Sequence, residues 1–435
     1  MTHGNGSRRL DVHALARVEG EGALHVTITD GELTAVQLNI YEPPRFFEAF
    51  LRGRGYEEPP DITARICGIC PVAYQMSACL AIEDACGAVV DGQLAALRRL
   101  LYCGEWIESH ALHIYMLHAP DFLGYDGAIS MARDHRAVVE RGLRLKKVGN
   151  RLLEVIGGRA IHPVNVRVGG FYRLPSDGEL AELVPELEWA RRAALETVEW
   201  VAGFPIPAYE GDWELVALAG GSEYPIMGRN VGSVSGRLDI PVSEFSEHIH
   251  EEHVEHSNAL HGRWDGGEYV VGPLARYSLN HRLLPAVARQ AAADAGLGPE
   301  CRNPFQSIVV RAVEVVAACD EALRLIGEYE APAAPAVEVV PRAGVGHGAS
   351  EAPRGLLYHR YEIDGDGTIA AATIVPPTSQ NQRAIEHDLA HVVEANLQLD
   401  DLALTARCEH TIRNYDPCIS CATHFLDLRV DRVST

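Results

Sequence analysis

The chain lacks any long apolar run: no stretch approaches the ~20 apolar residues that a membrane-spanning helix requires. Positive charge is also scarce, because 38 Lys and Arg stand against 60 Asp and Glu, and the formal net charge is −22. This balance argues against nucleic acid or an anionic membrane surface as a partner. Residues 1–10 contain no apolar signal core. We therefore expect a cytoplasmic protein without a membrane span.

Most cysteines of the chain show neither the spacing of an iron–sulfur cluster nor the pattern of a disulfide framework. Six of them lie scattered in apolar segments, where free cysteine packs as a small hydrophobic side chain. These are Cys79, Cys86, Cys103, Cys301, Cys319 and Cys408. Such usage indicates a reducing compartment.

Apolar residues recur at helical spacing over most of the chain, whereas strand patterns are short. Helical patterns cover 71–118, 131–157, 178–203, 243–263, 281–295, 304–329 and 382–407. Strands at 23–29 and 33–40 flank an Asp-Gly turn, and 358–363 with 368–375 resemble a second hairpin. The Pro-, Ala- and Gly-rich stretch 331–348 is typical of a surface crossing. The sequence thus predicts a mainly α fold with small β elements (α+β), in one large domain.

The remaining four cysteines form two Cys-x-x-Cys pairs at opposite ends of the chain. Cys67 and Cys70 stand in Arg-Ile-Cys-Gly-Ile-Cys, and Cys418 and Cys421 in Asp-Pro-Cys-Ile-Ser-Cys-Ala-Thr-His. Four converging thiolates make a soft donor set that suits a transition metal. A structural zinc knuckle usually closes over a short local loop, but here the whole domain must fold to unite the pairs. On the cysteines alone, a structural zinc site and a catalytic metal centre remain equal alternatives.

Both motifs together resemble the signatures of the large, catalytic subunit of nickel–iron hydrogenases, and the resemblance extends from Arg17 to His424. It implies that family's helical core and a catalytic domain over residues 1–424. It also implies that a maturation protease removes the extension 425–435 after His424.

The resemblance assigns roles to the four cysteines. All four would bind nickel, with Cys67 and Cys418 terminal. Cys70 and Cys421 would also bridge to an iron that carries carbonyl and cyanide ligands, because bridging requires a sulfur with spare lone pairs.

Three further segments match the family's residues for proton transfer. In Arg-Val-Glu-Gly, Glu19 would take a proton from a terminal nickel thiolate, Cys418. In Pro-Arg-Gly, Arg354 would lie over the metals, bind a cyanide and act as, or beside, the proton-accepting base. Asp121 would orient Arg354. Without the family, Glu19 would be a solvated acid, and Arg354 and Asp121 an ordinary ion pair.

Two other positions flank the expected metals. The hydroxyl of Thr378 would donate to the second cyanide, although an extra proline leaves the register open. Tyr74 occupies a position where many family members carry His, and its phenol can still donate a hydrogen bond near the bridging sulfur.

A magnesium site is implied near the C-terminal histidine. Glu48 and His424 would hold the ion with a main-chain carbonyl from 372–375, since carboxylate and carbonyl oxygens suit magnesium. Glu42 is a competitor for Glu48, which could instead be a helix-surface acid.

The implied reaction is reversible oxidation of dihydrogen, split heterolytically, with Cys418 or Arg354 receiving the proton and Glu19 passing it outward. Electrons would leave through a small subunit with iron–sulfur clusters. Segments 42–48 and 71–76 resemble the cytoplasmic, NAD(P)-linked or sulfhydrogenase-type branch, which implies an FAD-containing diaphorase subunit and a ferredoxin-like subunit. Deazaflavin-linked and heterodisulfide-reductase-linked relatives remain open, as do a hydrogen sensor and a non-catalytic scaffold with a structural zinc site.

A histidine-rich segment falls outside these motifs. Its histidines alternate with glutamates at spacings that could hold a surface metal on a helix, but a solvated charged helix is favoured. The histidines are His248, His250, His253, His256 and His261.

Overall fold

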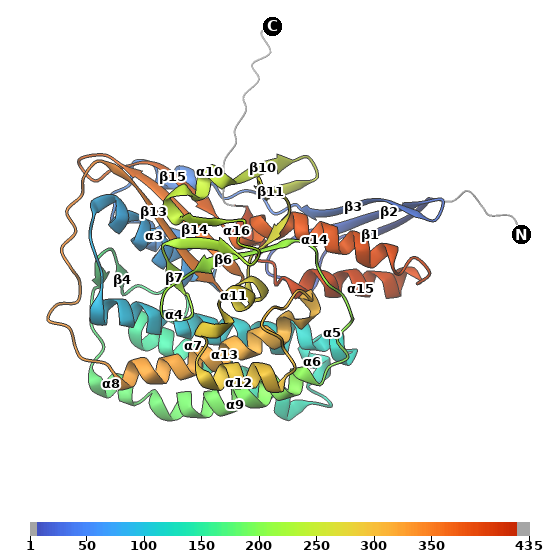
Figure 1. The fold of residues 1–435 in the computed structure, drawn as a ribbon, viewed down its shortest axis with the longest axis horizontal. Helices are drawn as coiled ribbons and strands as arrows, with labels where there is room; N and C mark the ends of the chain where they lie inside the picture. The colour runs from blue at the N-terminus through green and yellow to red at the C-terminus, as the bar shows by residue number, and fades with distance from the viewer. Residues whose placement is uncertain (1–6, 424–435) are drawn as a thin grey trace, which may run out of the picture.

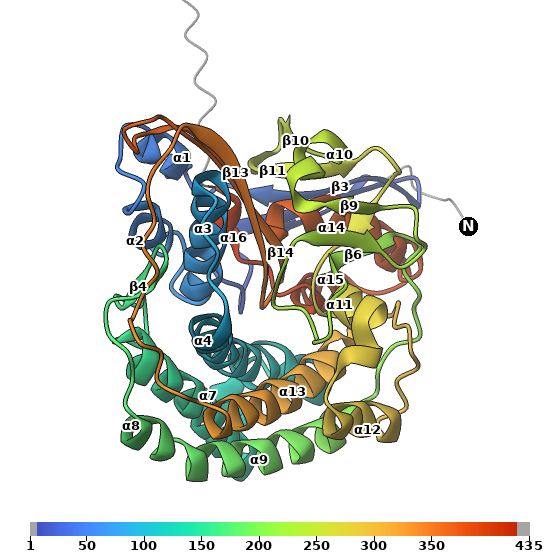
Figure 2. The same cartoon turned by 60° about the vertical axis from the view of Figure 1, so that its left-hand side comes forward.

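The computed structural model describes residues 7–423. Long helices form one half of the molecule and β-sheets lie across the other half, in both views (Figures 1 and 2). The prediction of a mainly helical fold with smaller β elements is confirmed. Among the described residues, no helix has the length and apolar character that a membrane crossing requires. His424 and the extension 425–435 lie outside the described residues.

The helical half is built from α4 (Gly92–Leu112), α7 (Arg136–Gly157), α9 (Val184–Ala202) and α13 (Ser307–Gly327). Helices α4 and α7 cross closely where two glycines meet. A Cβ on Gly149 would come within 2.6 Å of the carbonyl oxygen of Gly104 and of the amide nitrogen of Glu108. Helix α4 continues into a π-helical turn, His113–His118, and then into α5 (Ala119–Leu123).

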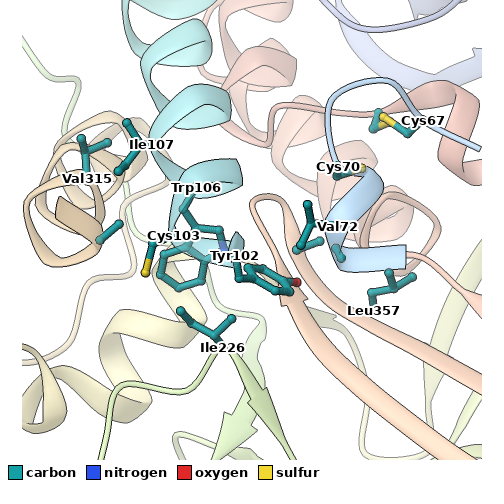
Figure 3. Close-up of a cluster of buried hydrophobic side chains, with 14 of the residues drawn as sticks. Cys67, Cys70, Val72, Tyr102, Cys103, Trp106, Ile107, Ile226, Val315 and Leu357 are labelled. Carbon is teal, nitrogen blue, oxygen red and sulfur yellow. The ribbon is translucent and has the colours of Figure 1, made fainter. Parts of the chain in front are cut away.

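Helix α3 (Pro71–Cys86) lies between the helical half and the sheets (Figure 2). It ends at Gly87, whose left-handed conformation separates it from α4, so the predicted helical stretch 71–118 is broken there. Buried side chains cover nearly all of its surface. Figure 3 shows Cys67 and Cys70 beside Val72, at the edge of the cluster that contains Trp106.

The predicted N-terminal hairpin is confirmed. Strands β1 (Ser7–Val12), β2 (Gly22–Thr29) and β3 (Glu32–Ile40) form an antiparallel meander. Asp30 and Gly31 both have positive φ, as the turn between β2 and β3 requires.

The second predicted hairpin is also confirmed, within a larger sheet. This sheet has the order β15 (Ile369–Val375), β14 (Gly355–Ile363), β13 (Gly344–Ala352) and β7 (Met227–Gly228). Residues 344–348 were predicted as part of a surface crossing, which is wrong. They form strand β13, because Gly346 and Gly348 let its backbone contact the backbone of α3 where any Cβ would clash.

Two helical predictions are wrong. Residues 243–263 contain only a short turn of helix, α10 (Phe245–His248), and then the hairpin β10 (Ile249–Val254) and β11 (Ser257–Trp264). Buried and less buried side chains alternate along most of β11, and Ile249 pairs with Trp264.

Residues 382–407 form parts of two helices instead of one: α14 (Pro377–Glu394) and α15 (Asp401–Asn414). Asp400 caps the start of α15 by accepting a hydrogen bond from the amide of Ala403.

The remaining elements include a four-stranded sheet that the sequence analysis did not predict, with the order β12 (Tyr269–Val270), β6 (Glu214–Ala219), β8 (Asn230–Ser233) and β9 (Asp239–Pro241). The shorter elements are α1 (Phe47–Leu51), α2 (Pro59–Thr63), α6 (Ala128–Met131), β4 (Val166–Arg167), β5 (Gly170–Phe171), α8 (Asp177–Ala181), η2 (Val242–Glu244), α11 (Pro273–Asn280), η3 (His281–Leu283), α12 (Ala286–Asp294), η4 (Pro304–Gln306) and α16 (Ile419–Ala422).

Candidate metal centre

The fold brings the two cysteine pairs together at the start of two helices. Cys70 is the N-cap of α3, and Cys418 is the N-cap of α16. All four cysteines are buried and outside any disulfide, and their sulfur atoms lie within 4.8 Å of one another. The sulfurs of Cys67 and Cys418 are 3.3 Å apart, those of Cys70 and Cys421 are 3.7 Å apart, and those of Cys418 and Cys421 are 2.6 Å apart.

This donor set fits a soft transition-metal centre. Hydrogen bonds with the neighbouring thiols lower the pKa of Cys67 well below its ordinary value, so one thiolate is already favoured. Sulfur is the ligand atom that nickel, iron and zinc accept most readily in a buried site of this kind. The four cysteines therefore fit the nickel–iron centre that the motifs predict, and the surroundings decide between it and a structural zinc site.

Arg45 links the two cysteine loops. Its Nη2 donates to the carbonyl oxygens of Ile66 and Ser420, both at 2.5 Å, and its amide donates to the carbonyl of Thr423. Arg45 lies in segment 42–48, whose resemblance to the family does not predict this contact.

Glu105, on α4, holds the start of α3 directly after Cys70. Its carboxylate accepts the amides of Val72 and Ala73, at 2.6 and 3.1 Å, which a helix N-terminus otherwise leaves without partners. Glu105 is an acid inside an otherwise apolar helical stretch. This could have marked it as a functional residue, but the sequence analysis did not single it out.

Glu19 lies against the second cysteine loop, as predicted. It forms a parallel β-bridge with Cys418, and its Oε2 lies 3.1 Å from the sulfur of Cys418 and accepts the amide of Ser420 at 3.1 Å. Burial, followed by the negative charge of Cys67, raises the pKa of Glu19. This carboxyl can therefore exchange a proton with the adjacent thiol.

Ser420 bridges Glu19 to a second carboxylate, with its amide on Glu19 and its hydroxyl on the other acid. The hydroxyl of Ser420 donates to Oε1 of Glu42 at 2.8 Å, and Glu42 is only partly buried. Glu42 was considered as a magnesium ligand, but these contacts place it on the Glu19 side of the centre.

Arg354 lies in the tight turn between β13 and β14, where Gly355 has a φ of +139°. Its Nε donates to the carbonyl of Asp416 at 2.7 Å, and its Nη2 lies 3.2 Å from Oδ1 of Asp416. Its Nη1 is buried and has no hydrogen-bond partner among the described residues. Burial lowers the pKa of Arg354, but Asp416 and the cysteine thiolates outweigh burial and raise it well above its ordinary value.

The prediction that Asp121 orients Arg354 is wrong. Asp121 accepts two hydrogen bonds from Arg413, at 2.7 and 2.8 Å, and one from Arg17 at 2.5 Å. Asp416 takes the predicted place beside Arg354, because its left-handed backbone, with a φ of 51°, turns it there just before Cys418. Its position in the Asp-Pro-Cys motif was the signal.

Thr378 and Tyr74 both lie at the centre. The amide of Cys418 donates to Oγ1 of Thr378 at 3.0 Å, so this hydroxyl keeps its own hydrogen for another acceptor. Burial raises the pKa of Tyr74 well above its ordinary value, and the charges of Cys421 and Cys70 add to the effect. The phenol therefore keeps its proton beside the sulfurs and can donate it in a hydrogen bond.

Glu48, predicted as a magnesium ligand, accepts the amide of Ile374 at 2.7 Å, within the segment expected to supply a carbonyl. Its expected partner, His424, lies outside the described residues. Burial, and then Glu48, raises the pKa of Glu251 to about 8. Glu251 accepts a hydrogen bond from Ser379 and was missed because its segment was predicted to be helical.

A helical protein with a buried four-thiol centre, a proton-accepting carboxyl against one thiol and a buried guanidinium beside the sulfurs belongs to the class of redox metalloproteins. The model of the nickel-dependent hydrogenases matches residues 45–141 and 242–424, and the chain belongs to this family. It is a catalytic large subunit whose four cysteines bind the nickel–iron centre.

Known relatives agree along nearly the whole chain. The alpha subunit of sulfhydrogenase 1 from Pyrococcus furiosus is 35% identical over 96% of this chain and 98% of its own length. The beta subunit of the NAD-reducing hydrogenase HoxS from Cupriavidus necator is 25% identical over 97% and 95%. The solved structure of an NAD+-reducing [NiFe]-hydrogenase in its H2-reduced state superposes with a TM-score of 0.87 and 26% identity, over 96% of this chain and 99% of that one.

Proposed function

We propose that this subunit cleaves dihydrogen reversibly and heterolytically, and that its electrons pass through an iron–sulfur small subunit to NAD(P). The contact between the Cys418 sulfur and the Glu19 carboxyl carries this proposal, because it joins a metal-ligating thiol directly to a proton carrier. When bound, the nickel–iron centre supplies the Lewis-acidic metal pair that such cleavage needs.

The order of the cysteines in the two motifs, and not their sulfur distances, supports separate roles, since the shortest contact joins Cys418 to Cys421. Cys67 and Cys418 come first in their motifs, and we assign them as the terminal nickel ligands. Cys70 and Cys421 come second, and we assign them as the thiolates shared by nickel and iron.

Cys418 is the group that accepts the proton of dihydrogen in this mechanism. Arg354 is the weaker candidate, because a guanidinium whose pKa is raised keeps its proton. The thiol of Cys418 passes its proton to Oε2 of Glu19. Glu42 is the next carboxylate along, linked to Glu19 by the amide and the hydroxyl of Ser420.

Three hydrogen-bond donors lie at the centre, and two of them would serve the diatomic ligands of an iron. We assign the buried Nη1 of Arg354 to one cyanide, and the hydroxyl hydrogen of Thr378 to the other. Tyr74 would donate to a bridging sulfur. A closed zinc site would leave the Nη1 of Arg354 without a partner, at a cost of roughly 1–3 kcal/mol.

We also infer a magnesium ion held by Glu48 and His424, with water completing its shell. Hydrogenases of known electron acceptor support the link to NAD(P): the HoxS relative is NAD-reducing by name, as is the protein of the superposed structure. A flavin-containing diaphorase subunit, a ferredoxin-like subunit, a maturation protease that cuts after His424 and a cytoplasmic location belong to the same proposal.

An infrared spectrum of the complex purified with its own partners tests the proposal. We expect carbonyl and cyanide stretching bands, and hydrogen-dependent reduction of NAD+ or NADP+ by the same preparation. Tail-processed protein with one zinc ion per chain and no such bands would refute the function. Bands without reduction of either nucleotide would refute only the electron acceptor.

A further inference from the structure

A second cluster of metal-ligating side chains lies on the β10–β11 hairpin, where the sequence analysis noted histidines. His256 is in the turn, His261 is on β11, and Glu386 is on α14. One ligand atom from each residue lies within 4.8 Å of those of the other two. In Figures 1 and 2 the hairpin, β3 and α14 lie in the half of the molecule opposite α7, α9 and α13.

Glu386 is held in position by the neighbouring sheet. Its Oε1 accepts the amide of Leu38, on β3, at 2.8 Å and lies 2.8 Å from Nε2 of His256. Carboxylates that bind metals are commonly held in position by a hydrogen bond of this kind.

A hydrogen bond between His256 and Glu386 does not account for His261, the third member of the cluster. Its side chain is 2% exposed, and its Nε2 is buried with no hydrogen-bond partner among the described residues. A buried nitrogen without a partner costs free energy unless something binds it. The imidazole planes of His256 and His261 stand at 87°, with ring centroids 5.6 Å apart, so the two rings do not stack.

The nearest cation does not fill this role. Arg383, one turn before Glu386 on α14, pairs with Glu252 of β10, so its charge is compensated within the hairpin. The side chains of His256 and Glu386 are 23% and 19% exposed, which leaves the cluster reachable from solvent.

We propose that His256, His261 and Glu386 bind a divalent first-row transition metal of the zinc type, at a site separate from the four-thiol centre. Two imidazoles and one carboxylate are a ligand set that zinc accepts, with water as a fourth ligand. Ligand atoms within 4.8 Å of one another can close around an ion with metal–ligand distances of about 2.0–2.2 Å.

The site joins three parts of the chain. The metal ties the hairpin turn and β11 to α14, and Leu38 of β3 supports the carboxylate. Helix α14 also carries Thr378, which binds the amide of Cys418. A metal here therefore stabilises the helix that supports the second cysteine loop.

Metal analysis of the intact heteromeric complex, after exposure to zinc and removal of the excess, tests this site. We expect one zinc ion per large subunit beyond any zinc in the other sites. A competing chelator should remove this zinc with a single affinity. In His261→Gln, and independently in the less buried His256→Gln, that zinc is lost and the apparent Kd rises at least about 100-fold. The unfolding midpoint of the native complex rises with zinc, and that of the variants does not.

The matched control is His250→Gln, on the exposed side of β10, which keeps the zinc ion. Unchanged carbonyl and cyanide bands in all three variants show that the fold and the thiol centre are intact. Equal zinc content in His250→Gln and His261→Gln, or no extra zinc in the native complex, would mean that the cluster is only a hydrogen-bonded group and would overturn the proposal.

Discussion

The segment with Cys67 and Cys70 runs into a buried 16-residue helix, whereas the segment with Cys418 and Cys421 contains a helix of only four residues. The first loop is placed by the packing of α3, with one capping carboxylate from Glu105 and one hydrogen bond from Arg45 to Ile66. The second is placed by polar side chains from distant parts of the sequence. These are Glu19, Arg45 and Thr378.

The difference indicates a division of roles. A loop fixed by helix packing supplies rigid ligands, and its neighbours contribute mainly to stability. A loop fixed by polar contacts places titratable groups against its sulfurs, so its neighbours can also carry protons. Substitutions around Cys418 should therefore impair chemistry more than folding, and substitutions around α3 and α4 should do the reverse.

Glu19→Gln gives the largest expected effect. The amide keeps the shape and can still accept the amide of Ser420, but it cannot take a proton from Cys418. Loss of a positioned proton carrier should lower hydrogen turnover at least about 100-fold. Infrared bands and the unfolding midpoint should stay within error of the native complex.

The control is Glu21→Gln, an exposed acid two residues away, which should keep full turnover. If Glu19→Gln instead lost the bands, Glu19 would be a structural support, and the proposed contrast between the loops would fail.

Arg45→Met removes the contact that spans both loops. Two hydrogen bonds from a charged group are lost, which costs about 3 kcal/mol, or roughly 100-fold in the stability of the paired arrangement. We expect nickel to be lost to a chelator faster than from the native complex, with the helical circular dichroism unchanged. Arg54→Met, which removes an arginine whose side chain is 55% exposed, should retain nickel normally. Equal nickel retention in the two variants would contradict this role of Arg45 and would mean that only the metal keeps the two loops together.

Asp416→Asn and Asp121→Asn separate the two arginine pairs. Asp416 contacts Arg354 directly, so its neutral variant should shift the cyanide bands and lower turnover about 10-fold. Asp121 pairs with Arg413 and Arg17, so Asp121→Asn should leave the cyanide bands in place. A shift of the cyanide bands in Asp121→Asn, but not in Asp416→Asn, would support the original prediction that Asp121 orients Arg354.

The residues that carry the chemistry were largely predictable, because their motifs are local in sequence. Both cysteine pairs, Glu19 and Arg354 could be located from short segments of fixed spacing, and the structure brings them together. The partner of Arg354 was not predicted: Asp416 stands in the Asp-Pro-Cys motif, but only the left-handed backbone there shows that it faces Arg354.

The same limit applies to the fold. Alternating apolar residues predicted the hairpin of β2 and β3, where an Asp-Gly turn fixes the register. In 243–263, charged residues and histidines fitted both a helical and a strand pattern, and pairing of β10 with β11 decided between them. Strand β13 depends on tertiary contact with α3, and its glycines are the only feature of the sequence that indicates this contact.

Glu108→Gln should give the smallest effect, on stability and not on chemistry. Glu108 lies one turn after Glu105 on α4, and burial raises its pKa from 4.5 to about 7, against the opposing effect of Lys146, which lies 2.6 Å away. The folded carboxyl therefore keeps its proton up to about pH 7, whereas the unfolded one loses it near pH 4.5. Native stability should fall as the pH rises through this window, by about 3 kcal/mol, and level off above it.

The variant cannot ionise at this position, so its unfolding midpoint should change less between pH 4.5 and 7, while hydrogen turnover stays within about twofold. Glu140→Gln, at an exposed position on α7, should reproduce the native pH profile. An effect of Glu108→Gln on turnover larger than its effect on stability would place the α3–α4 side among the proton-handling elements. The division between the two cysteine loops would then have to be abandoned, because both sides would couple folding to chemistry.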